Sequence, residues 1–336
     1  MTIIRIGLDT SKHVFQLHGV DENEKPVLRR QLQRRAVEKF FAKLPSARVG
    51  IEACGASHHW ARVLCGFGHE VVLIPPQYIK PYVKRGKNDA IDAAAICEAM
   101  SRPTMRFVPV KTAEQQAALT MLGVRDLLVK QRTMLINALR GHAAEFGVTV
   151  AKGPQQMREL LQRLTTAEGV PALAREMLGM LAAQIEAVNG KLRAIEARLM
   201  AWHRHDQTSQ CLATIPGIGP IGGVSFALKV ADAKAFRSGR HFAAWIGITP
   251  REGSTAGKHR LGRISRAGDE DLRRLLVLGA TAVIQQAQRG RASPWLLGLL
   301  ARKPKKLAAV ALANKMARIV WAMMVSGETY RRPAQA

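Results

Sequence analysis

The first third of the chain alternates between short apolar runs and more polar, helix-like segments. Runs of β-branched or alternating apolar residues, typical of strands, lie at residues 3–8, 14–20, 27–32, 49–51 and 70–74. Helices are expected at about residues 36–44 and 58–67, on either side of the fourth run. A hairpin-rich start followed by β-α-β alternation predicts a mixed sheet with flanking helices. We therefore expect an α/β domain over residues 1–106.

The middle of the chain predicts long helices. Thr112 and Gln115 have the spacing of a capping box, which predicts a helix from there to about residue 146. A second helix carries apolar residues at alternating spacings of three and four, the pattern of a heptad seam: Leu178, Leu181, Ile185, Val188, Leu192, Ile195, Leu199 and Trp202. Residues 107–205 are thus expected to form a helical coiled-coil segment. The seam fits an intramolecular hairpin with the preceding helix, or pairing with a second chain, which would make the protein a dimer or larger.

Residues 206–336 predict a third, mainly α-helical domain. Its two clearest helices are expected at about residues 270–288 and 307–325. Near its start, Pro216, Gly217 and Gly219 lie between two short helical stretches, a pattern typical of a helix-hairpin-helix. In that motif, glycines allow backbone N–H groups and a helix N-terminus to approach a phosphate. A plain glycine-rich turn is the simpler alternative.

The balance of charge favours a polyanionic partner. Lys and Arg outnumber Asp and Glu by 51 to 25, which gives a formal net charge of +26 and a pI near 10.9. Neutralising nucleic-acid phosphates releases condensed counterions, so this excess favours nucleic-acid binding over a merely basic protein face. Residues 211–336 carry 21 basic and 6 acidic residues, or +15 of the total, and should hold much of the phosphate-contact surface. A basic stretch at residues 80–87, which includes Lys84, Arg85 and Lys87, is a second candidate.

Four carboxylates stand out against this basic background. Asp9 and Glu52 each close an apolar run, and Asp89 and Asp92 share one face of an expected helix at i, i+3. Clustered carboxylates raise one another's pKa unless a cation lies among them. Carboxylate oxygens suit Mg²⁺, which binds through few carboxylates together with water and substrate phosphate. The four residues together predict a Mg²⁺-dependent nucleic-acid enzyme, although a helix cap or a surface position is the commoner place for any single Asp.

A hydroxyl-bearing, glycine-rich loop spans residues 249–266. Its cations are candidates for phosphate contacts: Arg251, Lys258, Arg260, Arg263 and Arg266. The loop differs from a Walker A loop, because Glu252 occupies the first glycine position and His259 replaces the required Ser or Thr. Spacing alone favours a phosphate-binding loop. A sharper hypothesis makes Ser254 a nucleophile that attacks a phosphodiester while nearby Arg and Lys stabilise the developing charge.

The remaining potential ligands predict no further site. The cysteines at positions 54, 65, 97 and 211 show no Cys-x-x-Cys spacing, so neither a zinc site nor a disulfide framework is expected. His58 and His59 are expected to pack or to lie at the surface rather than to catalyse. The N-terminus lacks a signal peptide, and Lys315 and Arg318 interrupt the most apolar late stretch. We expect a cytoplasmic protein with reduced thiols and no membrane partner.

The order of the acidic residues, on the first strand, a later strand and a late helix, resembles the RNase H-like fold in its RuvC-type branch. Combined with residues 216–219 (Pro-Gly-Ile-Gly) and 254–265, the four carboxylates resemble those of the DEDD transposases, the insertion-sequence recombinase family that also includes the Piv DNA invertase. The resemblance covers nearly the whole chain. It is closest to the subgroup with a Ser-Ser/Thr-Gly-Gly-Lys motif before Arg-Leu-Gly-Arg-Ile-Ser, although Ala256 stands here where many relatives have Gly.

This resemblance implies an architecture and a mechanism. A RuvC-like domain, a coiled-coil segment and a C-terminal transposase domain are expected, with the four carboxylates as Mg²⁺ ligands. Ser254 would form a covalent phosphoserine link to cleaved DNA, with Thr255 as the alternative nucleophile. The two parts of the site can come from different subunits of a tetramer. A structured non-coding guide RNA would pair with the target and donor DNA.

Two other functions remain open. In a Holliday-junction or structure-specific Mg²⁺-dependent endonuclease, the carboxylates would support attack by water and Ser254 would be a bystander. In a non-catalytic nucleic-acid-binding protein, the carboxylates would be structural. A covalent protein–DNA intermediate distinguishes the recombinase from the nuclease, and loss of activity in Asp9→Ala would exclude the non-catalytic protein.

Overall fold

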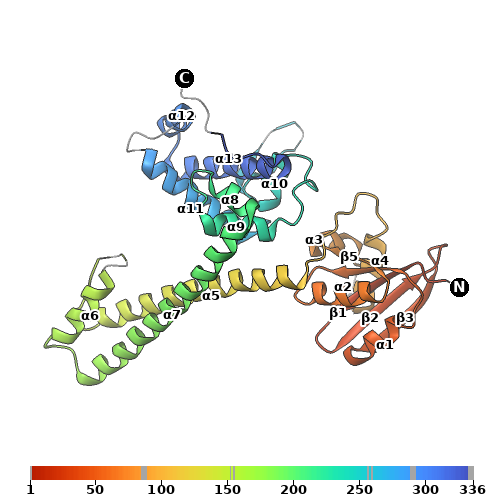
Figure 1. The fold of residues 1–336 in the computed structure, drawn as a ribbon, viewed down its shortest axis with the longest axis horizontal. Coiled ribbons are helices and arrows are strands. Elements are labelled where there is room, and N and C mark those ends of the chain that lie inside the picture. Colours follow the sequence, from red (N-terminus) through yellow and green to blue (C-terminus); the bar gives the residue numbers. More distant parts are fainter. Residues whose placement is uncertain are drawn as a thin grey trace. The chain divides into compact units, whose positions relative to one another are not determined.

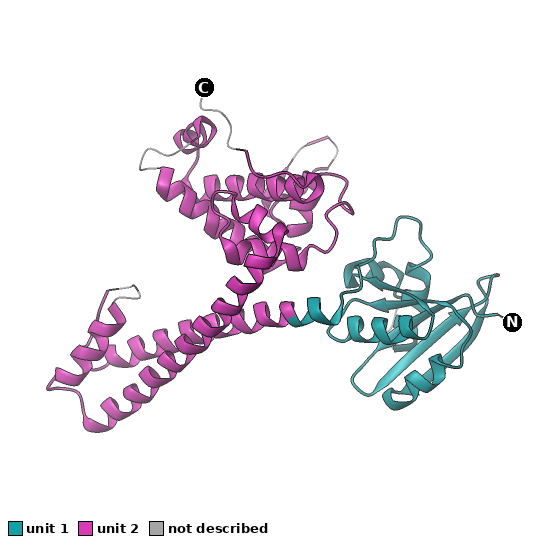
Figure 2. Ribbon diagram, viewed as in Figure 1, with its two compact units in different colours: residues 1–117 teal, residues 118–336 magenta. Residues whose placement is uncertain are grey.

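The computed structural model describes residues 2–84, 89–151, 153, 156–255, 257–258, 260–287 and 293–331. The chain divides into two compact units, Met1–Ala117 and Ala118–Ala336 (Figure 2). The first unit is α/β and the second is mainly helical. Mixed α/β architecture followed by a helical C-terminal part therefore agrees with the sequence pattern. The finer division at residues 106 and 205 stays a prediction.

The first unit contains a five-stranded mixed sheet of order β3-β2-β1-β4-β5 (Figure 1). Its strands are β1 (Arg5–Thr10), β2 (Val14–Val20), β3 (Pro26–Gln33), β4 (Arg48–Glu52) and β5 (Glu70–Ile74). β1 pairs antiparallel with β2 and parallel with β4; β2–β3 is antiparallel and β4–β5 is parallel. The five apolar runs thus form the five strands, and the expected mixed sheet is confirmed.

Helical segments cover both faces of this sheet. They are η1 (Arg34–Ala36), α1 (Val37–Phe41), α2 (Ser57–Gly66), α3 (Pro76–Ile79), η2 (Lys80–Tyr82) and α4 (Asp89–Ala99). One core joins the sheet to α1 and α2 through Phe15, Phe41 and Trp60, all nearly inaccessible to solvent. On the other face α4 packs directly on β1, where a Cβ placed on Gly7 would lie 2.0 Å from the Ala93 carbonyl oxygen. Only glycine allows this close approach of helix and strand.

The second unit begins with a helical hairpin. Its helices are α5 (Ala113–Ala144, which starts in the first unit), α6 (Gln156–Thr166) and α7 (Ala172–His205). The capping box is confirmed: the Gln115 backbone N–H donates to Thr112 Oγ1 at 3.1 Å, and the Thr112 N–H donates to Gln115 Oε1 at 3.0 Å. The intramolecular arrangement of the seam is the one observed, because Leu128 of α5 packs on Val188 and Leu192 of α7.

The rest of the second unit is a helical core with one small hairpin. Its elements are α8 (Gln207–Ala213), α9 (Pro220–Lys229), α10 (Gly239–Ile246), β6 (Pro250–Glu252), β7 (Leu261–Ile264), α11 (Glu270–Ala287), α12 (Pro294–Arg302) and α13 (Lys305–Ser326). α13 is long and apolar enough to cross a membrane by length and composition alone. It lies against α10, α11 and α12, however, and buries Ala313, Met316 and Val320 in the core. These contacts are those of a central core helix.

An ion-pair network fastens this core to the helical hairpin. Lys229 Nζ of α9 lies 3.0 Å from Asp269 Oδ1 and 2.9 Å from Asp271 Oδ2. Arg274 of α11 pairs with Asp271 and with Asp126 of α5. The hairpin and the C-terminal core are therefore linked by charged as well as apolar contacts.

Candidate functional site

Three of the four predicted carboxylates converge in the first unit. Asp9 lies near the end of β1, while Asp89 and Asp92 lie in the first turn of α4. One carboxylate oxygen from each lies within 4.8 Å of the others. They meet because α4 packs closely over Gly7, two residues before Asp9 on the same face of β1. We call Asp9, Asp89 and Asp92 the acid cluster.

Glu52 lies at the end of β4, which is parallel and adjacent to β1. It lies outside the set of three mutually close carboxylates, but its charge interacts with those of Asp9 and Asp92. Burial and the Asp92 carboxylate raise its pKa, while the Lys80 ammonium lowers it. Glu52 is thus placed at the border of the acid cluster, as parallel neighbouring strand ends predict.

The acid cluster carries strong mutual repulsion. The pKa of Asp9 is raised from 3.8 to about 6. Burial is the largest cause, and the negative charges of Asp92, Asp89 and Glu52 follow in that order. Repulsion of this kind is relieved by a cation placed among the carboxylates. The donor set is all oxygen and partly open to solvent, which fits Mg²⁺ or a similar hard divalent ion that retains water ligands. The residues present therefore fit a divalent cation.

Lys80 is a charged neighbour of the acid cluster that the sequence did not single out. Residues 80–87 were expected to form a basic linker, but residues 80–82 form the short helix η2. This turn places Lys80 near Glu52, whose pKa it lowers. The proline pair at residues 75–76, followed by Pro81, was the available signal for a compact turn in place of an extended linker.

His58 serves structure rather than chemistry. Its Nδ1 accepts a hydrogen bond from the Lys111 backbone N–H at 3.2 Å, and its Nε2 lies 3.2 Å from Lys111 Nζ. Burial, Lys111 and Arg62 lower the pKa of His58 from 6.5 to about 4, so the ring is neutral at pH 7. His59 is exposed and its ring contacts Trp60 edge-on. Both agree with the expectation of packing or surface positions.

Ser254 lies on the β6–β7 hairpin of the second unit. Its hydroxyl donates to Glu252 Oε1 at 3.2 Å and accepts from the Arg260 backbone N–H at 3.2 Å. The Gly253 N–H donates to the Arg260 carbonyl at 2.9 Å, and Thr255 bridges to Lys258. In the described residues, the expected loop is thus a hairpin that holds the Ser254 hydroxyl between a carboxylate and a backbone N–H.

The predicted cations of this loop surround the same hairpin. Arg251 Nε and Nη2 donate to the Ser265 carbonyl, which fixes that guanidinium along the strand pair. Lys258, Arg260, Arg263 and Arg266 are exposed. Arg266 has a φ of 56°, and its N–H donates to the Gly247 carbonyl at the turn into the helical core. The hairpin therefore presents positive charge around the Ser254 hydroxyl.

The segment with Pro216, Gly217 and Gly219 joins α8 to α9, two helices that pack together. Gly217 has a φ of 88°, and a Cβ there would lie 2.7 Å from the carbonyl oxygen of Gly279 in α11. The close approach that requires a glycine at position 217 is therefore to α11. Gly217 and Gly219 are both exposed, and Gly219 caps α9 with open space around it, so phosphate contact at this turn stays a prediction.

Of the basic stretch before α4, Lys84 is described and exposed. Arg85 and Lys87 lie outside the described residues, as does His259 of the hairpin.

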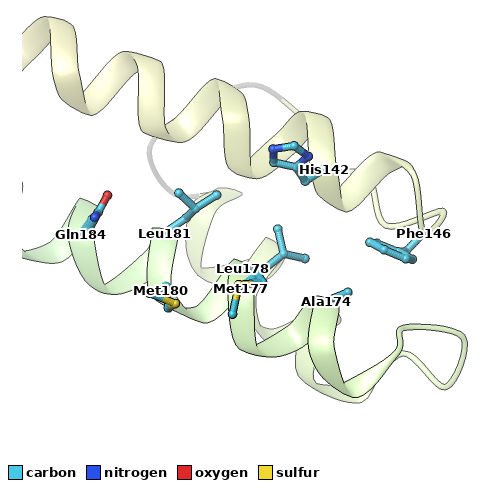
Figure 3. Close-up of a pocket in the computed structure, with 8 residues that line it drawn as sticks. All are labelled: His142, Phe146, Ala174, Met177, Leu178, Met180, Leu181 and Gln184. Atoms are coloured by element: carbon cyan, nitrogen blue, oxygen red, sulfur yellow. The ribbon is translucent and has the colours of Figure 1, made fainter.

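An apolar cavity of about 430 Å³ lies between α5 and α7 (Figure 3). His142 of α5 and Phe146 in the turn after it line one side, and Leu178, Leu181 and Gln184 of α7 line the other. The cavity contains one imidazole and one amide among apolar side chains. This composition lacks the paired acids or nucleophile that a hydrolytic or transfer site requires.

Two protein-family models match separate parts of the chain. A family model described as "Transposase IS116/IS110/IS902 family" matches residues 209–293, and one of the DEDD type, described as "Transposase", matches residues 6–147. The chain is 56% identical to "Putative transposase y4pF/y4sB" of Sinorhizobium fredii, over 98% of this chain and 86% of that protein.

Two transposases named for insertion sequences show the same end-to-end similarity. The chain is 39% identical to the transposase for insertion sequence element IS1111A of Coxiella burnetii, over 97% of this chain and 91% of that protein. It is 38% identical to the transposase for insertion sequence element IS1328 of Yersinia enterocolitica, over 97% of this chain and 98% of that protein.

Proposed function

The chain belongs to the IS110 family of insertion-sequence transposases, and from that premise we propose that it is an RNA-guided, Mg²⁺-dependent recombinase that cleaves and rejoins DNA through a phosphoserine intermediate. The observation that carries the proposal is the convergence of Asp9, Asp89 and Asp92 from a strand and a helix that are far apart in sequence. DNA is the substrate of a transposase, and the DEDD type of its N-terminal model suggests that it uses a divalent metal.

The first unit supports a RuvC-type assignment. Its strand order β3-β2-β1-β4-β5, with acids on β1, β4 and a following helix, is the arrangement expected from the RNase H-like resemblance. Asp9, Asp89 and Asp92, with Glu52 at their border, would hold the cation. A divalent ion bound there supplies charge stabilisation at the oxygens of a reacting phosphodiester. Lys80 adds a fixed positive charge beside the phosphate path.

The β6–β7 hairpin supports serine chemistry. Ser254 Oγ attacks phosphorus, so that the Oγ–P bond forms while the P–O bond to the leaving strand breaks and the leaving oxygen takes a proton. Glu252 accepts the hydroxyl proton, since its Oε1 already receives the Ser254 hydrogen bond. Exposed cations at positions 258, 260 and 263 stabilise the charge that develops on the phosphate. Thr255, in the adjacent bridge to Lys258, is the alternative nucleophile.

The partners follow from charge and from exposed apolar side chains. A net charge of +26 fits both the DNA and a guide RNA, since both present phosphates. The hairpin of α5 and α7 leaves Met134 and Leu173 each 69% exposed and Met180 58% exposed. A second copy of the chain would cover such side chains, which supports a homodimer or a tetramer.

A detergent-quenched cleavage assay tests the proposal. Purified protein, the element's RNA, end-labelled donor DNA and Mg²⁺ are incubated and resolved on a denaturing gel. We expect a labelled band that migrates with the protein for the wild type and for Ser265→Ala, a nearby hydroxyl control. The band should be absent for Ser254→Ala.

Each other result has a definite meaning. A band that persists in Ser254→Ala and disappears in Thr255→Val would move the nucleophile by one residue. Cleaved DNA with no covalent band would replace the recombinase by a hydrolytic nuclease. Activity that does not depend on the added RNA would remove the guide from the proposal.

A further inference from the structure

A groove of about 960 Å³ lies on the sheet of the first unit, beside the acid cluster. α4, Tyr82 and Lys84 form its wall, and β2 and β3 form its floor. α4 packs over β1 at Gly7 and also contacts β2, and the sheet beyond the helix remains open at Arg29 and Gln31 of β3. Its volume is at the upper end of the roughly 300–1,000 Å³ range typical of ligand sites.

The floor of the groove is a polar extension of the acid cluster. Directly opposed residues on antiparallel strands share a face, and Asp9 opposes Gln16, which in turn opposes Gln31. The next row on this face runs from Gly7 through His18 to Arg29. The groove floor is therefore continuous with Asp9 across three strands.

The charge of the groove is positive. Arg29 from the floor and Lys84 from the wall both act on His18, whose pKa they lower together with burial. Two of the acids that line the groove are already paired, Glu24 with Arg5 and Glu98 with Arg102. Among the described residues, no carboxylate forms an ion pair with Arg29 or Lys84. Like charges that face one another across a groove favour an anion between them.

An open face of an antiparallel sheet is commonly polar simply because it is solvated. That explanation does not account for a walled cavity whose two acids are paired with arginines and whose floor is continuous with Asp9. We propose that this groove binds one strand of the DNA substrate, with Arg29 and Lys84 holding its phosphates and Gln16 and Gln31 contacting it on the way to Asp9. The inference rests on the proposed function, because it takes the acid cluster as the place where the DNA is cut.

The occupant is a single DNA strand rather than a duplex or the RNA. The cavity volume suits a few nucleotides of one strand that lies between the wall and the floor. Continuity with Asp9 requires the strand to be the one that is cleaved, which is DNA in a transposase. The amides of Gln16 and Gln31 fit contacts to the sugar-phosphate backbone, which carry no sequence information, and Tyr82 offers a ring to an unstacked base.

The test is photocrosslinking of the full-length protein to a single-stranded oligodeoxynucleotide that contains 5-iododeoxyuridine, without divalent cations, with crosslinked peptides mapped by mass spectrometry. We expect crosslinks at His18 or Tyr82. Arg29→Gln/Lys84→Gln should weaken binding at these sites roughly 25-fold at 0.1 M salt and flatten their salt dependence by about 1.4 in log–log slope, because each lost contact to a single strand removes about 0.7.

The matched control is Lys39→Gln/Lys43→Gln, which removes the same charge from exposed side chains at α1 and just after it. Neither lysine lines the groove. This control should keep the wild-type crosslinks. Crosslinks that map only outside the groove, or an equal loss in both double variants, would overturn the proposal.

Two further outcomes separate the groove from the serine mechanism. Stronger crosslinking by an RNA of the same sequence would overturn the assignment to DNA. Groove crosslinks in a protein that forms no Ser254–DNA adduct would sustain the groove while refuting the proposed function. Wild-type adduct formation by Arg29→Gln/Lys84→Gln would show that the cleaved strand takes another path, and would overturn the groove alone.

Discussion

The acid cluster and the β6–β7 hairpin present their reactive groups in opposite ways. In the acid cluster, carboxylates from β1 and α4 are held together by a tight helix–strand contact in a packed core. In the hairpin, Ser254 is held only by neighbours within six residues, Glu252 and Arg260. One centre depends on tertiary packing and stores electrostatic repulsion, whereas the other is local and almost free of strain. The two should therefore respond differently to the same kind of mutation.

The largest expected effect is on the rate of strand cleavage, in a variant that keeps its fold. Asp92→Asn removes one oxygen donor and one negative charge from the acid cluster, and we expect strand cleavage to fall on the order of 10³-fold. Glu38→Gln, an exposed acid on α1, serves as the charge-matched control and should retain full activity. Cleavage rates under single-turnover conditions measure both. Near-normal cleavage by Asp92→Asn would show that this carboxylate is structural.

Packing offers the next largest difference. A Cβ on Gly7 would lie 2.0 Å from the Ala93 carbonyl oxygen, so Gly7→Ala must push α4 away and should cost about 3 kcal/mol of unfolding free energy. In the hairpin, a Cβ on Gly253 would meet its nearest atom at 3.8 Å, and Gly253→Ala should change stability little. Urea unfolding of both variants provides the comparison. Equal stability would contradict a packing-dependent acid cluster.

Proton transfer within the hairpin gives a smaller effect. Glu252→Gln keeps a hydrogen-bond acceptor but removes the base, and should slow phosphoserine formation about 10²-fold. Quenched-flow measurement of adduct formation by the wild type and by Glu252→Gln tests this. An unchanged rate in Glu252→Gln would assign Glu252 a merely structural part.

The smallest expected effect is on the pH dependence of stability, through the raised pKa of Asp9. The pKa of Asp9 is raised to about 6 in the folded protein, so the folded state holds this proton more tightly than the unfolded state does. The cation-free protein should thus lose stability as pH rises from about 4 to about 6, and stay destabilised above it. Asp9→Asn should recover about 1 kcal/mol at pH 7.5, less than a full conversion of the shift because solvent screens the carboxylate.

Thermal unfolding with and without Mg²⁺ checks this prediction. Mg²⁺ should stabilise the wild type and have little effect on Asp9→Asn. Ser254→Ala is the control, because the hairpin stores no such repulsion and this variant should behave like the wild type. A lower melting temperature for cation-free Asp9→Asn would contradict the account.

The sequence predicted the acid cluster better than its neighbourhood. Strand periodicity located Asp9 and Glu52 at strand ends, and the i, i+3 spacing of Asp89 and Asp92 placed both on one helix turn, since these are local properties of the backbone. The contact of α4 with Gly7 could not be predicted, because it joins residues more than eighty positions apart. The close approach of Gly217 to Gly279 could not be predicted for the same reason, because the two residues are remote in sequence.

The sequence pattern did not predict the two short strands of the β6–β7 hairpin. Residues 249–266 were expected to form an irregular loop, so Glu252 was noted only as a departure from a Walker A pattern. Side chains two residues apart in extended backbone point the same way, and this geometry brings Glu252 to Ser254. The α5–α7 pairing was left open between one chain and two, because a heptad seam records periodicity and not the identity of its partner.

The most direct test of the account asks whether the two centres act in one reaction. The measurement is the yield of Ser254–DNA adduct formed by Asp9→Asn, with the element's RNA, donor DNA and a Mg²⁺ titration, relative to the wild type. If the acid cluster activates the phosphodiester that Ser254 attacks, the adduct should be absent in Asp9→Asn at every Mg²⁺ concentration and should rise with Mg²⁺ in the wild type. Adduct formation by Asp9→Asn at the wild-type level would show that the hairpin works without the acid cluster, and would contradict the central claim.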